Sequence, residues 1–565
     1  MAIRKPEKVD VVIVGAGATG GTAAKVLAEA GLQIVGLDRG PWLKGQDFSG
    51  DEIKYVNRNF LVPDARLNPR TYRESEYEEA RLEAFSMLPQ MVGGGTVHWA
   101  GWFPRPKPSD FIQLSLHGAV AGASLADWPY GYHDLEPYLS KVEWAFGCAG
   151  LDGADAFCPP RSTPYPTPPM PPTAFGKTFY RACETLGINA HPIPQAMITK
   201  PFKGRQPKHL TGFWNLYGDP TGMRSGAADT FIPEALATNN YEIRTGCRVL
   251  RITVNAAGEA NGVVYANAEG HETEQEADVV VLAAGAVESA RLLLLSATDA
   301  FPDGLANGSG LVGTHATFHE YLYAVGLFDR EITAPFDGYA GHYLSGGSMQ
   351  FFETDEKRGH INGSIIGASQ VGHPINWMLP GRPAWGEAAK QSDRDYFRHS
   401  MKVGMCLHDL PVATNRVDLD PTLKDAWGLS VARVTHKSHP NDMALAAWQL
   451  NKNAEILDAA GATQITAVTH KRCTGNTFHQ HGTARMGFDP EKSVLNEWCE
   501  AHDVPNLYVV DGSGFASALG VNPTLTMMAH AWRACDYIAR RHARGAKERA
   551  RRSVSIHKPA LEAAR

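Results

Sequence analysis

The sequence contains no apolar run of the ~18 residues that a membrane-spanning helix requires, so we expect no transmembrane segment. It also lacks a basic surplus, because 54 Lys and Arg residues stand against 60 Asp and Glu residues, a formal net charge of -6. A dedicated nucleic-acid-binding protein normally carries such a surplus, and we expect no nucleic-acid partner. Hydrophobic residues at 43% and charged residues at 20% are typical of a globular chain, which excludes extensive disorder.

Cysteine is sparse and scattered, since the eight cysteines among 565 residues form no CxxC pair. This spacing argues against a zinc ribbon, an iron–sulfur ligand run and a dense disulfide framework. We expect most of the cysteines to serve as small buried apolar groups.

The N-terminus is basic and then apolar from Val9 to Val14, a pattern shared with signal peptides. The apolar run is short, however, and it leads directly into a glycine-rich motif that cleavage would destroy. We therefore expect no signal peptide and a cytoplasmic protein. A periplasmic location stays open if the chain is exported with a partner.

That glycine-rich motif lies in the context of a strand, a helix and a second strand. The β-branched run Val9–Val14 predicts a strand buried on both faces, and Thr22–Ala30 has apolar residues at helical spacing. A second strand is predicted over Gln33–Asp38, ending in an acid. This order of elements is a much more specific signal for a dinucleotide-binding βαβ unit than the glycines alone.

Each residue of the motif has a chemical reason. Gly15 allows the tight turn, Gly17 lets the backbone approach a pyrophosphate, and Gly20 permits close packing of helix on strand. Asp38 can accept hydrogen bonds from the adenosine ribose, which disfavours NADP because a 2′-phosphate would meet a carboxylate. The motif does not choose between NAD and FAD.

Three further segments stand out. Gly93–Gly95 precedes Thr96-Val97-His98-Trp99, and successive glycines in an apolar setting indicate backbone packed against a flat or bulky group. The charge-rich segment Glu74–Glu83 predicts a solvated helix. Eight prolines in Phe157–Pro172 predict an extended segment, which could be a surface connector, a lid over a cleft or an arm that grips another subunit.

Nucleotide-domain patterns recur along the chain. Strands are predicted within Asp278–Gly285, followed by a helix from about Glu288 to Ser296, and within Asn506–Gly512. The alternation in 342–352 and 361–370 suits an antiparallel sheet. We therefore predict an α/β (α+β) fold, a Rossmann-like nucleotide-binding domain with an inserted antiparallel-sheet domain. The predicted divisions are 1–150, 226–314 and 476–545 for the first domain, 151–225 and 315–475 for the second, and a basic tail at 546–565.

These segments together resemble the glucose–methanol–choline (GMC) family of FAD oxidoreductases over nearly the whole chain. The resemblance rests, beyond the N-terminal GAGATGG with Asp38, on Gly93–Trp99, Ala284–Leu294, Gly310–Gly313 with His319, His479–Gly487, Asn506–Ser513 and Asn522–Thr526. The motif forms look most like gluconate 2-dehydrogenase flavoprotein subunits, glycoside 3-dehydrogenases and 3-oxidases, and pyranose oxidases. The resemblance implies an FAD cofactor and oxidation of a secondary hydroxyl of a sugar or glycoside to a keto-sugar.

The resemblance also assigns the site residues. His479 is implied as the base, and Asn522 as its partner on the same substrate oxygen. His98 corresponds to a histidine that is covalently bonded to the flavin in pyranose oxidases and that packs non-covalently in other relatives. The implied cofactor-binding residues are Gly15, Gly17, Gly20, Asp38, Gly94, Gly95, Thr96, His98, Ala284, Asp511, Gly512, Asn522, Pro523 and Thr524.

Several alternatives stay open at this point. Residues 208–217 lack the cysteine cluster that several electron-transferring relatives use for an iron–sulfur centre, so oxygen, a quinone-like dye or a cytochrome are open as acceptors. The chain could be the flavoprotein subunit of a multi-subunit dehydrogenase, a homo-oligomer or the partner of a small accessory subunit. It could also be a non-catalytic nucleotide-binding protein or an NAD-dependent reductase. We expect no metal at His481, because no third ligand lies at suitable spacing. Sugar-stacking aromatics are proposed among Trp214, Tyr217, Trp377 and Trp385.

Overall fold

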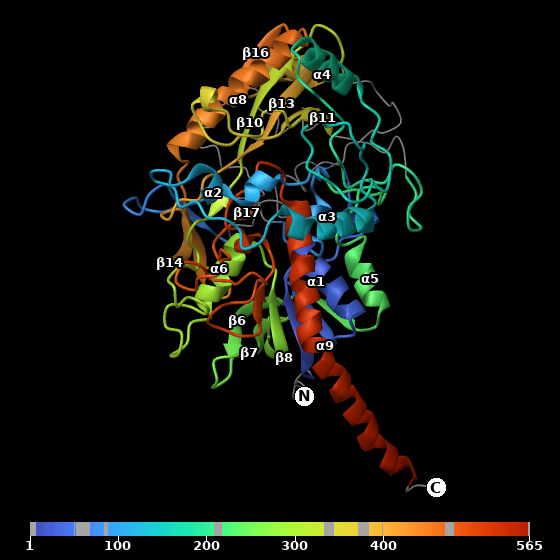
Figure 1. Cartoon of the computed structure of the whole chain (residues 1–565), viewed down its shortest axis with the longest axis vertical. Coiled ribbons are helices and arrows are strands. Elements are labelled where there is room, and N and C mark those ends of the chain that lie inside the picture. Colours follow the sequence, from blue (N-terminus) through green and yellow to red (C-terminus); the bar gives the residue numbers. More distant parts are fainter. Residues whose placement is uncertain are drawn as a thin grey trace.

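The computed structural model describes residues 7–49, 51, 68–83, 89–207, 217–332, 344–370, 383–397, 399–468 and 479–562. Its lower half in Figure 1 is built on a seven-stranded sheet of order β5-β2-β1-β8-β7-β6, with β18 beside β8. The β1, β2, β5, β8 and β18 pairings are parallel, whereas β6, β7 and the first half of β8 form an antiparallel meander. The strands are β1 (Val9–Val14), β2 (Ile34–Asp38), β5 (Tyr241–Thr245), β6 (Arg248–Val254), β7 (Ala260–Ala266), β8 (Glu272–Leu282) and β18 (Leu507–Val509).

Helices cover this sheet because its central strands are apolar on both faces. Val11, Val12 and Ile13 have no exposed surface at all, as predicted for a strand buried on two sides. Side chains of one face pack with residues of α1, α5 and α9 in a single core cluster. The helices of this part are α1 (Ala18–Glu29), α5 (Phe231–Ala237), α6 (Ala286–Leu295) and α9 (Thr524–Glu562). The last of these, α9, continues beyond the body of the molecule to the C-terminus (Figure 1).

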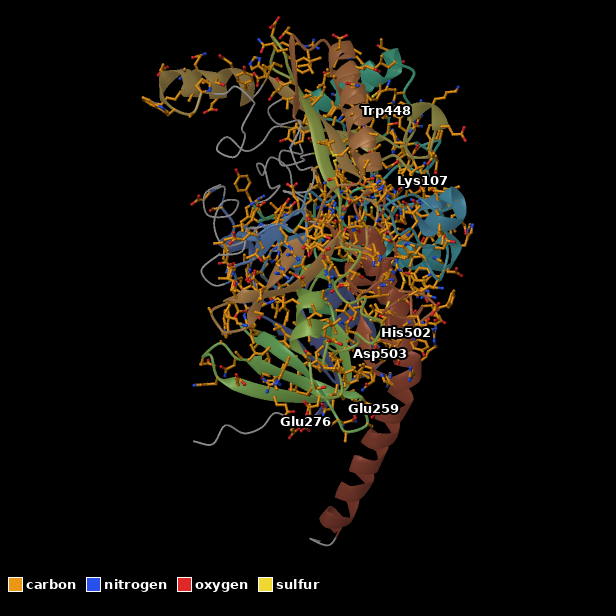
Figure 2. The ribbon with its side chains drawn as sticks, turned by 90° about the vertical axis from the view of Figure 1, so that its left-hand side faces the viewer. Lys107, Glu259, Glu276, Trp448, His502 and Asp503 are labelled. Carbon is orange, nitrogen blue, oxygen red and sulfur yellow. The ribbon has the colours of Figure 1, made fainter. Side chains whose placement is uncertain are left out.

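The upper half contains a five-stranded antiparallel sheet of order β11-β12-β13-β10-β16. Strand β11 pairs with β12 with Ser348 opposite Ile366, which confirms the antiparallel pattern predicted for these stretches. A core that includes Phe179, Val403 and Leu457 joins the sheet to α4 and α8, and Figure 2 shows Trp448 on α8 at this end, with Glu259 and Glu276 at the other. The elements are β10 (Glu320–Leu327), β11 (Leu344–Ser348), β12 (Ile366–Gln370), β13 (Ser400–Leu407), β16 (Gln464–Val468), α4 (Ala174–Thr185), α7 (Gly386–Phe397) and α8 (Pro440–Ala459).

A four-stranded sheet of order β14-β15-β3-β4 joins distant segments of the chain beside α6. Its strands are β14 (Arg416–Lys424), β15 (Ser430–Thr435), β3 (Thr71–Arg73) and β4 (Arg81–Leu82). The helix predicted over Glu74–Glu83 is therefore wrong: the segment forms a turn and enters β4. Pairing of β3 with β15 and β4 prevails over the local helix propensity, because backbone hydrogen bonds to partner strands are gained.

The proline-rich segment lies along α3 (Tyr132–Phe146) and contains no helix, as predicted. Arg161 bonds the Glu143 carboxylate at 2.7 Å, and the Ser162 backbone N–H donates to Glu136 at 2.8 Å. The two acids also hold the buried Arg105 guanidinium at 2.7 Å each. The segment is thus anchored to one helix of its own chain, which supports the connector interpretation over a lid.

Two other sequence expectations can be compared with the fold. Of the seven cysteines that the structure describes, six are buried and all are free thiols, as expected for small apolar groups. Within the described part of the chain, no helix is both long and apolar enough to cross a membrane.

Candidate active site

The turn after β1 has the geometry that its glycines predict. Gly15 has φ +94°, and a Cβ there would lie 2.6 Å from the Ala283 carbonyl oxygen. A Cβ on Gly20 would lie 1.9 Å from the Gly15 carbonyl oxygen, so helix α1 packs against the turn only because both positions are glycine. The start of α1 therefore faces the C-terminal edge of the parallel strands, where nucleotides bind in such folds.

Asp38 ends β2 beside this turn, as predicted. Its carboxylate accepts the backbone N–H of Ala16 at 2.9 Å and that of Gly40 at 2.8 Å. Burial raises the pKa of Asp38, against the lowering effect of these two hydrogen bonds. The acid thus holds the nucleotide turn in shape, a role that the sequence alone did not reveal.

The triple glycine meets the nucleotide turn directly. Gly93 has φ +92° and begins the short helix η3 (Gly94–Val97). A Cβ on Gly94 would lie 3.0 Å from the Cα of Gly17, whereas a Cβ on Gly95 would meet nothing within 4 Å. Gly95 is exposed although residues 91–93 and 96–98 are buried. The Gly17 and Gly94–Gly95 backbones therefore line one open surface free of side chains.

Thr96 and His98 follow the glycines and are buried. The Thr96 hydroxyl donates to the Gly93 carbonyl at 2.6 Å and accepts the Ala227 N–H at 3.0 Å, so it closes the turn on the neighbouring segment. His98 Nε2 lies 3.1 Å from the Met91 sulfur, and the ring packs edge-on against Phe48. His98 is thus held at the end of the glycine surface.

The C-terminal motif is tied to the same region through Asp511, which follows β18. Its carboxylate accepts the Gly285 N–H at 2.8 Å and the Ser289 hydroxyl at 2.6 Å, and it caps η6 (Gly512–Gly514) through the Ser513 N–H. Ala284 precedes Gly285 at the end of β8. A single buried acid thus joins the β8–α6 turn to the β18–η6 turn.

His479 lies where this C-terminal motif meets the upper half of the molecule. It precedes β17 (Gln480–His481), which pairs with β9 (Thr317–Phe318), and the Gly482 N–H donates to the Gly512 carbonyl at 3.0 Å. His319 Nδ1 lies 2.8 Å from His479 Nδ1. The side chain keeps part of its surface accessible, as a group that meets a substrate must.

The protonation state of His479 follows from its surroundings. Burial lowers the pKa of His479 to about 3, and burial together with its histidine neighbours holds the pKa of His319 well below its ordinary range. Both imidazoles are therefore neutral near pH 7. A neutral imidazole can accept a proton from a hydroxyl, the task that the family resemblance implies for His479.

Asn522 lies on the segment that leads into α9, followed by Pro523 and Thr524. It is buried, and its Oδ1 has no hydrogen-bond partner among the described residues. The carbonyl of Leu519, three residues earlier, lies 2.6 Å from His319 Nε2, which brings this segment to the histidine pair. An unpaired buried amide oxygen is costly unless a ligand completes it.

Three contacts of the site escape sequence reasoning. Tyr321 on β10 has its ring centroid 5.6 Å from that of His479, and Cys406 on β13 is the strand partner of Tyr321. The Leu519 contact is made by a backbone carbonyl, which no residue type announces. Only His319 carried a signal, as part of a motif that gave it no role.

Within the described residues, one cluster has the composition of a metal site: His319, Cys406 and His479. Burial raises the pKa of Cys406, so its thiol is protonated near neutral pH, whereas metals bind the thiolate. The two imidazoles face each other at the distance of an N–H···N hydrogen bond. His481 nearby stacks on Phe515, and neither of its ring nitrogens has a partner in the described part of the chain.

These features fit a flavin nucleotide. A glycine-lined surface with open space at Gly95, a helix start behind it and an unsatisfied buried amide at Asn522 are what a flat ring with a pyrophosphate requires. His479, on the segment that bonds the β18–η6 turn through Gly482, adds a neutral, buried histidine. A βαβ nucleotide unit combined with such a base defines the class of flavin-dependent oxidoreductases that act on CH–OH groups.

Comparison with known proteins gives the family. Residues 9–319 and 411–531 match the N- and C-terminal parts of the GMC oxidoreductase family. The chain belongs to this family, and its cofactor is FAD.

Individual relatives match along the whole length. The chain is 35% identical to 2-methyl-1,2-propanediol dehydrogenase of Mycolicibacterium austroafricanum, with 95% of this chain and 96% of that protein covered. It is 30% identical to the gluconate 2-dehydrogenase flavoprotein of Pantoea cypripedii (92% and 91% covered) and 29% identical to paromamine 6'-oxidase of Streptomyces fradiae (94% and 91% covered). The crystal structure of pyridoxine 4-oxidase shares the fold, with a TM-score of 0.64 at 18% identity over 94% of this chain and 99% of that one.

Proposed function

We propose that this protein oxidises a hydroxyl group of a sugar or glycoside to a carbonyl, with His479 as the base and Asn522 as its partner on the same oxygen. The flavin, when bound, accepts the hydride from the carbinol carbon. The observation that carries the proposal is the neutral, buried yet partly accessible His479, whose Nδ1 lies 2.8 Å from His319 Nδ1. A base at this position takes the hydroxyl proton as the hydride leaves.

The substrate class is inferred from relatives whose names include gluconate, paromamine and fructose. These names favour a polyhydroxylated substrate, and the motif forms favour attack at a secondary carbon, which gives a keto-sugar. A second candidate follows from the 35% identical relative, whose name specifies 2-methyl-1,2-propanediol. In that diol the second carbon bears no hydrogen, so only the primary hydroxyl can lose a hydride. A small vicinal diol oxidised to an aldehyde is therefore the alternative.

The electron acceptor is proposed on similar grounds. Relatives named as an oxidase, a dehydrogenase and a dehydrogenase large subunit allow oxygen, a dye or quinone, or a cytochrome partner. We propose that the flavin is held by the glycine surface, Asp38 and the β18–η6 turn, with Asn522–Thr524 toward its pyrimidine side. Its link to His98 is proposed as covalent or as packing, and acid precipitation distinguishes the two.

Product analysis tests the proposal. The purified protein is incubated with glucose, methyl glucoside, gluconate and 2-methyl-1,2-propanediol, each with an artificial electron acceptor, and carbonyl products are trapped with a hydrazine and identified by mass and NMR. A keto-sugar that has lost two hydrogens supports the first candidate, and an aldehyde from the diol alone supports the second. No carbonyl product from either class would revive a non-catalytic nucleotide-binding protein.

A further inference from the structure

His319 and His479 belong to a chain of hydrogen bonds whose donors and acceptors bear on the proposed base. His319 Nε2 lies 2.6 Å from the carbonyl oxygen of Leu519, and His319 Nδ1 lies 2.8 Å from Nδ1 of His479. The two rings are nearly perpendicular, at 89°, with centroids 4.8 Å apart. The three groups form a chain from a backbone carbonyl through one imidazole to the next.

The proton positions in this chain follow from donor and acceptor chemistry. A carbonyl oxygen can only accept, so His319 Nε2 must carry a hydrogen. A neutral imidazole has one N–H, so His319 Nδ1 carries a lone pair and must accept a hydrogen bond. His479 Nδ1 is then the donor, and His479 Nε2 is the nitrogen without a proton. The low pKa of both rings is consistent with the neutral forms that this reasoning assumes.

We propose that His319 is a positioning residue, which uses the Leu519 carbonyl to fix the tautomer of His479 so that Nε2 is the proton acceptor of the reaction. This inference rests on the proposed function, which makes His479 the base. An imidazole with its proton on Nε2 would present a donor to the hydroxyl and could not take its proton without first exchanging its own.

His319 is itself held firmly from both halves of the molecule. The preceding Phe318 N–H donates to the Asp409 carboxylate, which also bonds His436 Nε2 at 2.9 Å. Strand β9 pairs with β17, and His319 directly follows β9 while His479 directly precedes β17. A positioning role requires such rigidity, because a mobile partner would not select one tautomer.

Other groups among the described residues also lie near the pair. The His481 ring centroid lies 4.9 Å from that of His319, Cys406 lies within the same cluster as a protonated thiol, and the Tyr321 ring lies beside His479. His408 is nearby and bonds the Asp110 carboxylate at 3.1 Å. Each of these contacts is consistent with a proton that stays on His319 Nε2.

The reaction step balances with this assignment. The hydroxyl proton goes to His479 Nε2, the carbinol hydride goes to the flavin, and the O–H electron pair becomes the second C–O bond. His479 is then an imidazolium whose Nδ1–H still donates to His319. The proton on Nε2 is lost to solvent before the next turnover, so the tautomer is restored without rotation of either ring.

Rapid-mixing kinetics test the role with matched variants. His319→Leu removes the acceptor, whereas His319→Asn offers an amide oxygen near the Nδ1 position. We expect the anaerobic rate of flavin reduction to fall at least about tenfold in the Leu variant and to be largely recovered in the Asn variant. The loss should not exceed the 10²–10⁴-fold that a positioned base itself contributes. His530→Leu removes another buried histidine, bonded to Tyr130, and should leave the rate within about twofold. A full-rate Leu variant, or an Asn variant as slow as Leu with normal FAD content, would overturn the proposal.

A spectroscopic measurement covers the case in which His319→Leu does not fold. In protein with ¹⁵N-labelled histidine rings, the His479 signals are assigned by their loss in His479→Gln. We expect Nδ1 of His479 to be protonated and Nε2 to be bare, and the opposite pattern would overturn the proposal. The NMR measurement needs no turnover, so it tests the role of His319 independently of the proposed function. If His479→Ala keeps full activity, the assignment of His479 as the base is wrong, whatever the tautomer measurement shows.

Discussion

Gly17 and Gly94, from turns that lie 77 positions apart in the sequence, approach so closely that a Cβ on Gly94 would lie 3.0 Å from the Gly17 Cα. The contact joins the pyrophosphate turn of the βαβ unit to the triple-glycine turn. The open side of this contact, at Gly95, is where we place the flavin. The two glycine motifs are therefore parts of one surface rather than separate sites.

Alanine substitutions separate the two functions of this surface. Gly95→Ala puts a methyl group into open space, so we expect normal folding but a loss of bound FAD of at least about tenfold in affinity, because the methyl occupies the flavin face. Gly94→Ala, at φ +52° and against Gly17, should also lower the free energy of unfolding by at least about 1 kcal/mol. FAD titration and urea unfolding measure both. Undiminished FAD affinity in Gly95→Ala would place the flavin elsewhere.

Asp511→Ala should weaken the fold and the cofactor site together. The carboxylate satisfies the Gly285 N–H, the Ser289 hydroxyl and the Ser513 N–H, and its removal leaves these buried donors unpaired. We expect a loss of about 3 kcal/mol in the free energy of unfolding, less in Asp511→Asn, which keeps one acceptor. Denaturant unfolding of the FAD-loaded protein measures this. Equal stabilities of all three proteins would remove Asp511 as the joint between the two turns.

His479→Ala should keep its FAD and lose catalysis. The side chain is the proposed base, so reduction of the flavin by substrate should slow by at least ~100-fold, while the flavin absorbance spectrum and the FAD-to-protein ratio stay as in the unaltered chain. Stopped-flow mixing under anaerobic conditions measures the rate. An unchanged rate would show that another group removes the proton.

His98 gives a prediction about the flavin bond. Acid precipitation of the protein should leave a yellow pellet if His98 is bonded to the flavin, and a yellow supernatant if it only packs against the ring. With a covalent link, His98→Ala should transfer the colour to the supernatant. A yellow pellet in that variant would assign the bond to another residue.

Buried histidines should make the fold acid-sensitive. Burial lowers the pKa of His315 to about 4 and that of His530 to about 3, as for His479, whereas unfolded histidines titrate near 6.5. Below pH 6.5 the unfolded state binds more protons than the folded state, so the free energy of unfolding falls as pH falls, by up to about 1.4 kcal/mol per pH unit for each histidine. Urea unfolding between pH 7 and 5 measures the slope. His530→Leu should flatten it by one such increment, and an unchanged slope would contradict the assignment.

The sequence predicts local elements well because their signals are local. The β1–α1–β2 unit, the strand ending at Leu282, the helix α6 and the strand β18 all lie where apolar runs and glycines indicate. The helix expected over 74–83 is wrong because Arg81–Leu82 pairs with β3. Strand β3 in turn pairs with β15, more than 340 positions later. The predicted domain division stays a prediction, and this sheet joins segments from both sides of it.

The candidate site likewise contains residues that local motifs predict and contacts that they do not. His479, Asn522 and the glycines belong to motifs, so the sequence names them. The groups around them, the Leu519 carbonyl and the Cys406 thiol, come from backbone atoms or from distant strands with no local signature. Among the aromatics proposed for sugar stacking, Tyr217 is buried and Trp385 is 85% exposed, and Trp214 and Trp377 lie outside the described residues.

The most direct test of the central claim is an anaerobic substrate screen on the FAD-loaded protein. Sugars, sugar acids, glycosides and 2-methyl-1,2-propanediol are added one at a time while the yellow flavin band is followed, with the His479→Ala variant alongside. We predict that at least one hydroxyl substrate bleaches the band in the unaltered protein and that the variant bleaches at least ~100-fold more slowly. If no hydroxyl compound bleaches the band, or if both proteins bleach equally fast, the assignment of His479 as the base of an alcohol-oxidising flavoenzyme is contradicted.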